Sequence, residues 1–272
     1  MFVAAAVVDL GYSATAFAFA YDARDARMLA DVSSLGLSAE VGPTAKEGAR
    51  AAFRSRSLSI AFTRNPKSST YGLTVNSPSI AVGARLEAAS APSPITAVCG
   101  LGPGRTSVTE KRALLSASGY VSAGGQERSL EGGFGAYDYT HGLLPRRTRW
   151  NWAMLLGTTS EGDPIALNLV QGFMGEAECA AFTRAGVVGL PEGRFDFDPE
   201  RPLEPWRVRT SDGETDLEFA PGAMHAERKN LVLVRSRFVQ PVGTFSGTIG
   251  LGPRSVTIAR ALGVVEDQDV LW

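Results

Sequence analysis

Short stretches of β-type sequence, broken again and again by turn residues, most limit how this chain can fold. In Thr15–Tyr21 the larger residues alternate with alanines, a period of two that places the aromatic side chains on one face of a strand. Similar runs recur between clusters of Gly, Pro, Asn, Asp and Ser, at Phe2–Val8, Ser57–Thr63, Ser79–Leu86, Arg149–Leu156, Ile165–Val170, Leu231–Val234 and Ser255–Ala261. No long segment keeps the 3.6-residue period of a helix. The pattern predicts an all-β sandwich or barrel with little helix.

The composition fits a folded chain and excludes several classes of function. Of the 272 residues 44% are hydrophobic, too many for a disordered chain. The net charge of −1 gives no general attraction to nucleic acid or to an anionic membrane. The short basic patch at residues 146–150 has no matching basic face elsewhere, so no nucleic-acid partner is predicted. Two cysteines without CxxC spacing and two histidines argue against a zinc site, and neither metal nor cofactor is predicted.

The first twenty residues end in Ala-Phe-Ala, which resembles a signal-peptidase site. However, Asp9 interrupts the apolar stretch and no Lys or Arg precedes it, so we interpret this segment as a pair of strands. No apolar run approaches the length of about 20 residues that spans a bilayer. The sequence therefore predicts a cytoplasmic protein, and it does not determine an oligomeric state.

An internal repeat predicts two similar β domains. Gly100–Leu114 and Gly250–Leu262 share the order Gly-Leu-Gly-Pro, Ser-Val-Thr and Arg-Ala-Leu. We expect an N-terminal β domain over residues 1–124 and a C-terminal β domain over residues 125–272, joined by a flexible connection at Ser122–Gly125. A first copy of equal length would begin about 24 residues before the first residue, so the N-terminal domain is expected to lack its first strands. A wrongly assigned start, a truncated chain or shorter loops would each explain the difference.

The most unusual part of the sequence, residues 132–153, combines aromatic and polar residues. If its last part forms a strand, Trp150 and Trp152 lie on one face, and Arg149 and Asn151 lie on the other. Two tryptophans would then follow each other along one wall.

This strand is expected to form a hairpin with Ile165–Val170, across a turn at residues 158–163. Asn168 would then lie opposite the neighbourhood of Asn151 and Ala153. A polar pair inside an apolar sheet needs partners or a ligand.

These residues indicate a candidate binding site in a β cavity. Trp150 and Trp152 would line its wall. The polar groups that would converge on it are Asp138, Tyr139, His141, Arg149, Asn151 and Asn168. The alternative is that the tryptophans belong to the core and the polar residues form a structural network. In that case Asp138 is a turn residue and His141 a satisfied core histidine.

The same segment is similar to a known family. The residues that carry the resemblance are Asp138–Gly142, Arg147–Ala153, Gly243–Gly247 and the end of the chain, Gly263–Asp267 with Trp272. They resemble the bacterial domain-of-unknown-function family 2804 over essentially the whole chain. Members carry additional N-terminal residues ahead of the first residue of this chain, in agreement with the repeat. Membership implies no particular activity.

A fainter resemblance implies a fold. Asp138, Gly142 and the run Trp150–Trp152 resemble the Asp-His-x-Trp-Gly and Trp-x-Trp pattern of the carotenoid hydratase and AttH-like group, which are tandem lipocalin-like proteins. This implies two calycin-type β-barrel or sandwich units. Tyr139 and His141 stand where that group has histidine and tryptophan. Only the role of the acid therefore carries over, to Asp138.

Two functions follow as hypotheses. The first is non-catalytic binding of an apolar small molecule or lipid against the tryptophans, which needs no titratable acid. The second is acid-catalysed hydration or isomerisation of an apolar, terpenoid-like alkene. In that reaction Asp138, its pKa raised by burial, protonates the alkene, and Tyr139 or His141 orients it or deprotonates water. The tryptophan faces would stabilise the resulting carbocation by about 1–2 kcal/mol. A scaffold for protein contacts is a third possibility without a motif of its own.

Other motifs carry little weight. Gly100–Arg105 lacks the lysine of a phosphate-binding loop, and Gly243–Gly247 lacks the serine spacing of a nucleophile elbow. The acidic residues Glu266, Asp267 and Asp269 lack the spacing of an EF-hand. We interpret them as a solvated edge.

Overall fold

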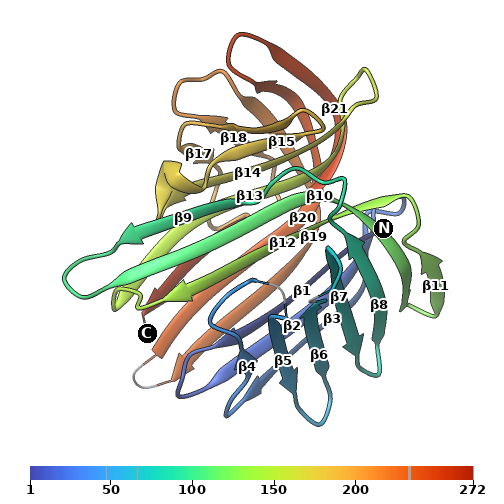
Figure 1. Cartoon of the computed structure of the whole chain (residues 1–272), viewed down its shortest axis with the longest axis vertical. Coiled ribbons are helices and arrows are strands. Elements are labelled where there is room, and N and C mark those ends of the chain that lie inside the picture. Colours follow the sequence, from blue (N-terminus) through green and yellow to red (C-terminus); the bar gives the residue numbers. More distant parts are fainter. Residues whose placement is uncertain (47, 66, 232–233, 272) are drawn as a thin grey trace. The chain divides into compact units, whose positions relative to one another are not determined.

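Nearly the whole chain is folded into β-strands (Figure 1). The computed structural model describes residues 1–46, 48–65, 67–231 and 234–271. Within this part of the chain the one helical segment is a 3-10 turn, η1 (Gly175–Glu178). The described residues include no helix with the length and apolar character needed to cross a membrane. The all-β prediction is confirmed.

The predicted strands form where the alternation places them. The first twenty residues make the hairpin of β1 (Phe2–Asp9) and β2 (Ala14–Asp22), as predicted. On β2 the rings of Phe17 and Phe19 are stacked on one face, with centroids 6.3 Å apart. The predicted run at residues 231–234 includes 232 and 233, which lie outside the described residues.

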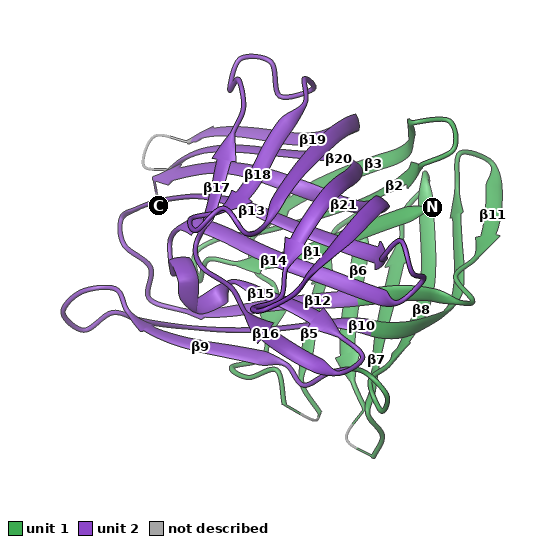
Figure 2. Ribbon diagram, turned by 90° about the horizontal axis from the view of Figure 1, so that it is seen from above, with its two compact units in different colours: residues 1–91, 115–135 green, residues 92–114, 136–272 purple. Residues whose placement is uncertain are grey.

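The chain divides into two compact units, which Figure 2 colours separately. Unit 1 comprises Met1–Ala91 and Leu115–Gly135, and unit 2 comprises Pro92–Leu114 and Ala136–Trp272. The division passes through one long strand, β10 (Thr106–Ala123). Each unit is therefore built from two separate segments of the sequence.

Gly124 and Gly125 form a tight turn and not a flexible connection. Both have positive φ angles, 60° and 74°, and Ala123 lies directly opposite Gln126, so β10 continues into β11 through a two-residue hairpin. The expectation of a linker here is wrong. The division into domains at residues 124 and 125 stays a prediction.

Unit 1 contains two antiparallel sheets. The first has the order β1-β2-β3, and the second has the order β11-β10-β8-β7-β6-β5-β4. The remaining strands are β3 (Arg27–Gly36), β4 (Glu40–Val41), β5 (Arg50–Arg54), β6 (Ser59–Arg64), β7 (Thr70–Asn76), β8 (Ile80–Glu87) and β11 (Gln126–Ser129). Their shared core includes the β2 alanines, Phe53, Ile60, Val75 and Val82.

Unit 2 contains a nine-stranded sheet of order β16-β15-β14-β13-β21-β20-β19-β18-β17. Its strands are β13 (Arg147–Thr158), β14 (Pro164–Gly172), β15 (Ala180–Thr183), β16 (Gly186–Gly189), β17 (Gly193–Asp196), β18 (Trp206–Thr210), β19 (Asp216–Leu231), β20 (Val234–Gly250) and β21 (Ser255–Leu271). The sheet curls far enough that the backbone N–H of Phe195 on β17 donates to Gln171 Oε1 on β14 at 3.0 Å. Leu155, Leu167, Trp206, Phe219 and Phe245 lie in its core.

Three further strands complete unit 2 and bear on the site below. Thr106–Lys111 of β10 pair with β9 (Ile95–Gly100), and β10 also pairs with β12 (Gly133–Gly142). The curled sheets of the two units match tandem barrel units, so the lipocalin-like architecture is confirmed.

The two copies of the sequence repeat lie in equivalent turns. Gly100–Arg105 connects β9 to β10, and Gly250–Arg254 connects β20 to β21. The backbone N–H of Leu101 donates to Arg105 O at 2.8 Å, and that of Leu251 donates to Arg254 O at 2.7 Å. Both turns lead into long strands and both belong to unit 2, and the duplication into two domains stays a prediction.

Candidate functional site

The two tryptophans of β13 lie on one face of the strand, as predicted, and each is half-buried. Directly opposite residues of antiparallel strands share a face, so the register decides which groups join them. Trp152 lies opposite Glu266 on β21. At Gly263 on the same strand a Cβ would lie 2.1 Å from Met154 O, so only glycine allows the two strands to approach this closely.

The Glu266 carboxyl is held by two N–H donors. Trp150 Nε1 donates to Oε2 at 3.0 Å, and Gln240 Nε2 donates to Oε1 at 2.6 Å. Burial among protein atoms raises the pKa of Glu266 to about 7, although these two hydrogen bonds oppose the change. The nearby charge of Asp138 raises this pKa further and that of Lys111 lowers it. Glu266 therefore exchanges a proton close to neutral pH.

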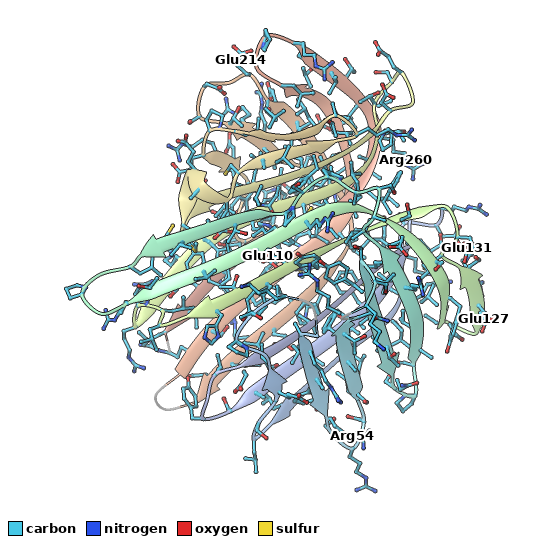
Figure 3. The ribbon with its side chains drawn as sticks, viewed as in Figure 1. Arg54, Glu110, Glu127, Glu131, Glu214 and Arg260 are labelled. Carbon is cyan, nitrogen blue, oxygen red and sulfur yellow. The ribbon has the colours of Figure 1, made fainter. Side chains whose placement is uncertain are left out.

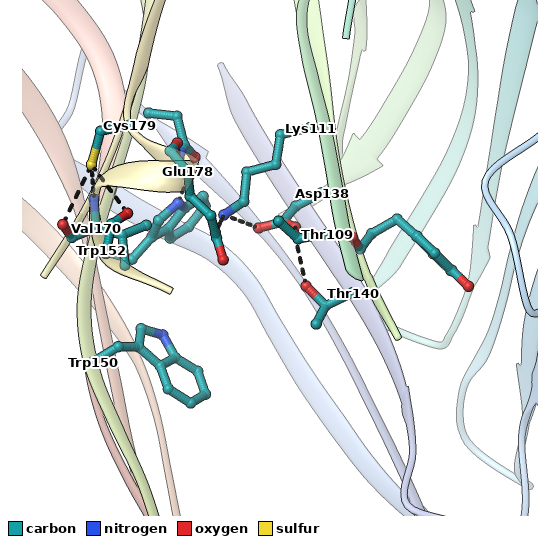
Figure 4. Close-up of polar contacts among 12 residues, drawn as sticks. Thr109, Lys111, Asp138, Thr140, Trp150, Trp152, Val170, Glu178 and Cys179 are labelled. Atoms are coloured by element: carbon teal, nitrogen blue, oxygen red, sulfur yellow. Dashed lines mark hydrogen bonds and ion pairs between the residues drawn. The ribbon is translucent and has the colours of Figure 1, made fainter. Parts of the chain in front are cut away.

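Beside this acid lies a buried ionic cluster of Lys111, Asp138 and Glu178 (Figure 4). Lys111 Nζ lies 2.8 Å from Asp138 Oδ2 and 2.8 Å from Glu178 Oε2. The Lys111 and Glu178 side chains are 4% and 3% exposed, whereas Asp138 is 36% exposed. The ammonium also lies 5.3 Å from the centre of the Trp152 ring. Trp152 thus borders both the cluster and Glu266.

The charges in this cluster stabilise one another. Burial alone would lower the pKa of Lys111, but the charges of Asp138 and Glu178 raise it overall. Burial raises the pKa of Glu178, and the Lys111 charge opposes that change. Lys111 is therefore an ammonium at neutral pH and is not an amine nucleophile.

Asn168 connects the tryptophan to the cluster. Trp152 Nε1 donates to Asn168 Oδ1 at 2.7 Å, and Asn168 Nδ2 donates to the backbone O of Glu178 at 2.6 Å. The predicted hairpin of β13 and β14 is confirmed, but its register places Asn168 opposite Met154. Asn168 therefore lies on the same face of the sheet as the tryptophans. The sequence had predicted it opposite the neighbourhood of Asn151, which is on the other face.

Strand alternation separates the three residues predicted to carry acid–base chemistry. On β12, Asp138 faces β10, where Thr109 Oγ1 lies 3.4 Å from Asp138 Oδ1. Tyr139 and His141 lie on the opposite face of β12, and His141 is exposed. Burial raises the pKa of Tyr139, and the charge of Glu110 on β10, which is labelled in Figure 3, raises it further. The structure brings only Asp138 of the three to the tryptophans.

Arg149 and Asn151 lie on the face of β13 that points away from the tryptophans. Arg149 is exposed, with Nε 3.4 Å from Asp269 Oδ2. Asn151 Nδ2 donates to the backbone O of Glu266 and to Asp267 Oδ1, both at 3.2 Å. Their contacts stabilise the pairing of β13 with β21 from the other side.

Four residues of this site were not predicted from the sequence: Lys111, Glu178, Gln240 and Glu266. The interpretation of the C-terminal acidic residues as a solvated edge is wrong for Glu266, which is held inside the site, and for Asp267, which is 8% exposed. Only the register of β21 with β13 places Glu266 beside the tryptophans. One weak signal was available in the sequence. Lys111 is at every second position with Ser107, Thr109 and Ala113, and all four lie on one buried face of β10.

A groove of about 370 Å³ lies elsewhere on unit 2, between residues 199–202 and the strands β19 and β20. Met224, Ala226 and Val239 form part of its lining, together with Arg228 and Arg237. None of the predicted site residues lines it. We therefore define the candidate site by its buried polar groups.

Comparison with solved structures shows the fold. Kievitone hydratase from Nectria haematococca matches with a TM-score of 0.61 at 13% identity, over 99% of this chain and 83% of that protein. CghA matches with a TM-score of 0.49 at 12% identity, over 97% of this chain and 85% of that protein. A Nitrosomonas europaea protein described as AttH matches with a TM-score of 0.48 at 14% identity, over 94% and 81%. The similarity to kievitone hydratase confirms, at the level of fold, the resemblance to the hydratase and AttH-like group.

None of the curated proteins matches the sequence. The family described as Domain of unknown function (DUF2804) matches residues 1–272, which is the whole chain. The motifs quoted above predicted this family. The chain therefore belongs to the DUF2804 family.

Proposed function

We propose that unit 2 binds a small, largely apolar molecule against Trp150 and Trp152 and that Glu266 transfers a proton to it. One observation carries the proposal. Glu266 is half-buried, and both oxygens of its carboxyl are held by N–H donors beside the two half-buried indoles. A positioned acid next to an apolar surface is the arrangement that general acid catalysis needs.

The ionisation of Glu266 supports proton transfer near neutral pH. A general acid works best when its pKa lies near the operating pH, because both the acid and the base form are then populated. The pKa of Glu266 is raised to about 7, chiefly by burial. The sequence-based candidate, Asp138, suits this role less well, because its Oδ2 accepts from the Lys111 ammonium.

The proposed reaction class is protonation of a carbon–carbon double bond, followed by addition of water or loss of a neighbouring proton. The carbocation would face the indole rings, which stabilise a desolvated cation by about 1–2 kcal/mol. Two carboxylates against one ammonium make the neighbouring cluster net negative, which also favours a cation. The name kievitone hydratase, borne by a protein of the same fold, fits this class.

The second candidate is binding without chemistry, as a carrier of an apolar molecule. The half-buried tryptophans favour it, because an indole wall binds apolar ligands without any acid. The two candidates differ in what Glu266 does. A carrier would keep its function in a Glu266→Gln variant, and an enzyme would not.

The test begins with the purified full-length protein and a small-molecule extract of the cells that make it, incubated in H2O and in D2O. Mass spectrometry would then follow the gain or loss of water and the incorporation of deuterium into carbon. We expect Glu266→Gln to lower turnover at least 100-fold while native mass spectrometry still detects the bound molecule. Glu218→Gln, a change of an exposed acid on β19, is the matched control and should leave turnover unchanged. Wild-type turnover in Glu266→Gln would contradict the proposed acid.

A further inference from the structure

The Lys111–Glu178 pair has unused hydrogen-bonding capacity inside the protein. An ammonium carries three N–H donors, and two carboxylates account for two of those on Lys111. The third N–H of Lys111 remains after these two ion pairs, on a cation that also lies 5.3 Å from the centre of the Trp152 ring. Glu178 Oε2 is paired with Lys111, but the other oxygen, Oε1, is buried and has no hydrogen-bond partner among the described residues.

A buried carboxylate oxygen without a partner calls for an explanation, because nearly all buried polar atoms are bonded. The Glu178 side chain is 3% exposed, so bulk water does not satisfy this oxygen. Its backbone is fixed as well, since Asn168 Nδ2 donates to Glu178 O at 2.6 Å. The pair therefore offers one donor and one acceptor side by side, and a hydroxyl group both accepts and donates.

We propose that Lys111 Nζ and Glu178 Oε1 together bind a hydroxyl group, either a water molecule or a hydroxyl of the substrate. The Lys111 ammonium donates to its oxygen, and Glu178 Oε1 accepts its hydrogen. This inference rests on the proposed function for the role of that group in a reaction. The binding site itself follows from the buried atoms alone.

In the proposed hydration the bound group is the water that adds to the carbocation. Glu266 gives its proton to one carbon of the double bond, and the π electrons form the new C–H bond. The water oxygen then forms a C–O bond to the other carbon, and Glu178 Oε1 takes the proton that the water releases. The sum is alkene plus water to alcohol, and exchange with solvent returns the proton from Glu178 to Glu266.

The positions of both carboxyls relative to Trp152 support this division of roles. Glu266 lies directly opposite Trp152 in the pairing of β13 with β21. Lys111, which holds Glu178, lies 5.3 Å from the centre of the same indole. A molecule against Trp152 would therefore meet the acid along one side and the hydroxyl site along another. Burial also raises the pKa of Glu178, which makes it a better base.

The first experiment is a high-resolution crystal structure of the full chain, without and with the molecule identified above. We expect one ordered oxygen within about 3 Å of both Lys111 Nζ and Glu178 Oε1 in the free protein. Persistence of this water beside the bound molecule identifies water as the source, and its replacement by a ligand oxygen identifies the substrate hydroxyl. An empty position, or a protein group bonded to Oε1, would overturn the proposal.

The second experiment separates hydration from protonation. In Glu178→Gln we expect the hydration rate to fall at least 100-fold while deuterium incorporation from D2O continues, because Glu266 is unchanged. The matched control is Glu176→Gln, which changes an exposed acid on the same η1 turn and should hydrate at the wild-type rate. Glu178→Asp keeps a carboxylate as the counter-ion of Lys111, but its shorter side chain moves the accepting oxygen away from the hydroxyl site. This variant should therefore lose hydration activity while remaining folded. Normal hydration in both Glu178 variants would overturn the role of Glu178 as base.

These outcomes distinguish the two proposals. If the wild-type protein incorporates no deuterium and hydrates nothing, the proposed function fails. The ordered oxygen at Lys111 and Glu178 then still decides whether the hydroxyl site exists.

Discussion

Glu266 joins two properties that oppose each other in a folded protein. Its carboxyl is largely surrounded by protein atoms, which favours the neutral acid, yet both oxygens accept hydrogen bonds from N–H donors, which favours the carboxylate. Burial dominates, and the pKa rises from its usual value of 4.5 to about 7. The same residue that would donate a proton to a ligand therefore makes folding depend on pH.

The pH dependence of stability gives the first prediction. Between pH 4.5 and 7 the folded chain holds a proton on Glu266 that the unfolded chain has released, so the free energy of unfolding falls as the pH rises. The shift corresponds to a loss of up to about 3 kcal/mol by pH 8. Urea unfolding of wild type and Glu266→Gln across this range should show the variant gaining relative to wild type by that amount. A constant difference between the two proteins at all pH values would contradict the raised pKa.

Lys111 gives the second prediction. Replacing it with Met leaves Glu178 buried without its counter-ion, so Lys111→Met should destabilise the protein by about 3–5 kcal/mol. Adding Glu178→Gln removes the uncompensated charge, and the double variant should regain more than half of that loss. Chemical unfolding of the two single variants and the double variant measures the coupling. Simple additivity of the two changes would show that the pair does not interact.

At the scale of the element, the two-residue period of a strand decides which neighbours in sequence act together. The sequence predicted β12 and β13 as parts of one cluster and placed both tryptophans correctly on one face. It did not separate Asp138 from Tyr139 and His141. Successive side chains of a strand point to opposite faces, so residues that are close in the sequence do not all reach the same site. It missed Glu266 and Lys111 for another reason, since strand register is set by contacts far apart in sequence.

The alternation of β12 gives the third prediction. The negative charge of Asp138 raises the pKa of Glu266, so Asp138→Asn should move the titration of Glu266 to lower pH. His141→Ala changes an exposed residue on the other face of β12 and should leave that titration where it is. The carboxyl carbon signal of Glu266 in 13C NMR reports both results. An equal shift in the two variants would mean that the strand does not separate them.

At the scale of the whole molecule, the fold class and the tandem architecture were predictable, because they depend on patterns repeated along the chain. The assignment of segments to units was not. Pro92–Leu114 belongs with Ala136–Trp272, although Leu115–Gly135 separates them in the sequence. Composition carries no mark of this arrangement, because the division falls inside one long strand, β10, whose residues 106–111 pair with β9 and whose residues 116–123 pair with β8.

The interleaved units give the fourth prediction. A fragment of residues 125–272 lacks the strand that carries Lys111, which leaves Glu178 buried and unpaired. We expect fragments 1–124 and 125–272 to lack cooperative unfolding when made separately and to recover it when they are made together. Circular dichroism during urea unfolding, with the intact chain as reference, measures this. A cooperative transition in the isolated 125–272 fragment would instead support independent folding of the domain predicted from the repeat.

The passage of β10 through both units also restricts how the length of this chain can vary. Insertion or deletion of one residue between Thr106 and Lys111 would reverse the facing of every side chain on one side of the change. If the pairing with β8 is kept, the residues before the change turn to the other face; if the pairing with β9 is kept, Lys111 turns outward and Arg112 inward. The turn between β9 and β10, residues 101–105, carries no such restriction. We therefore expect variation in length to accumulate in that turn, while this strand tolerates substitution but no change in its number of residues.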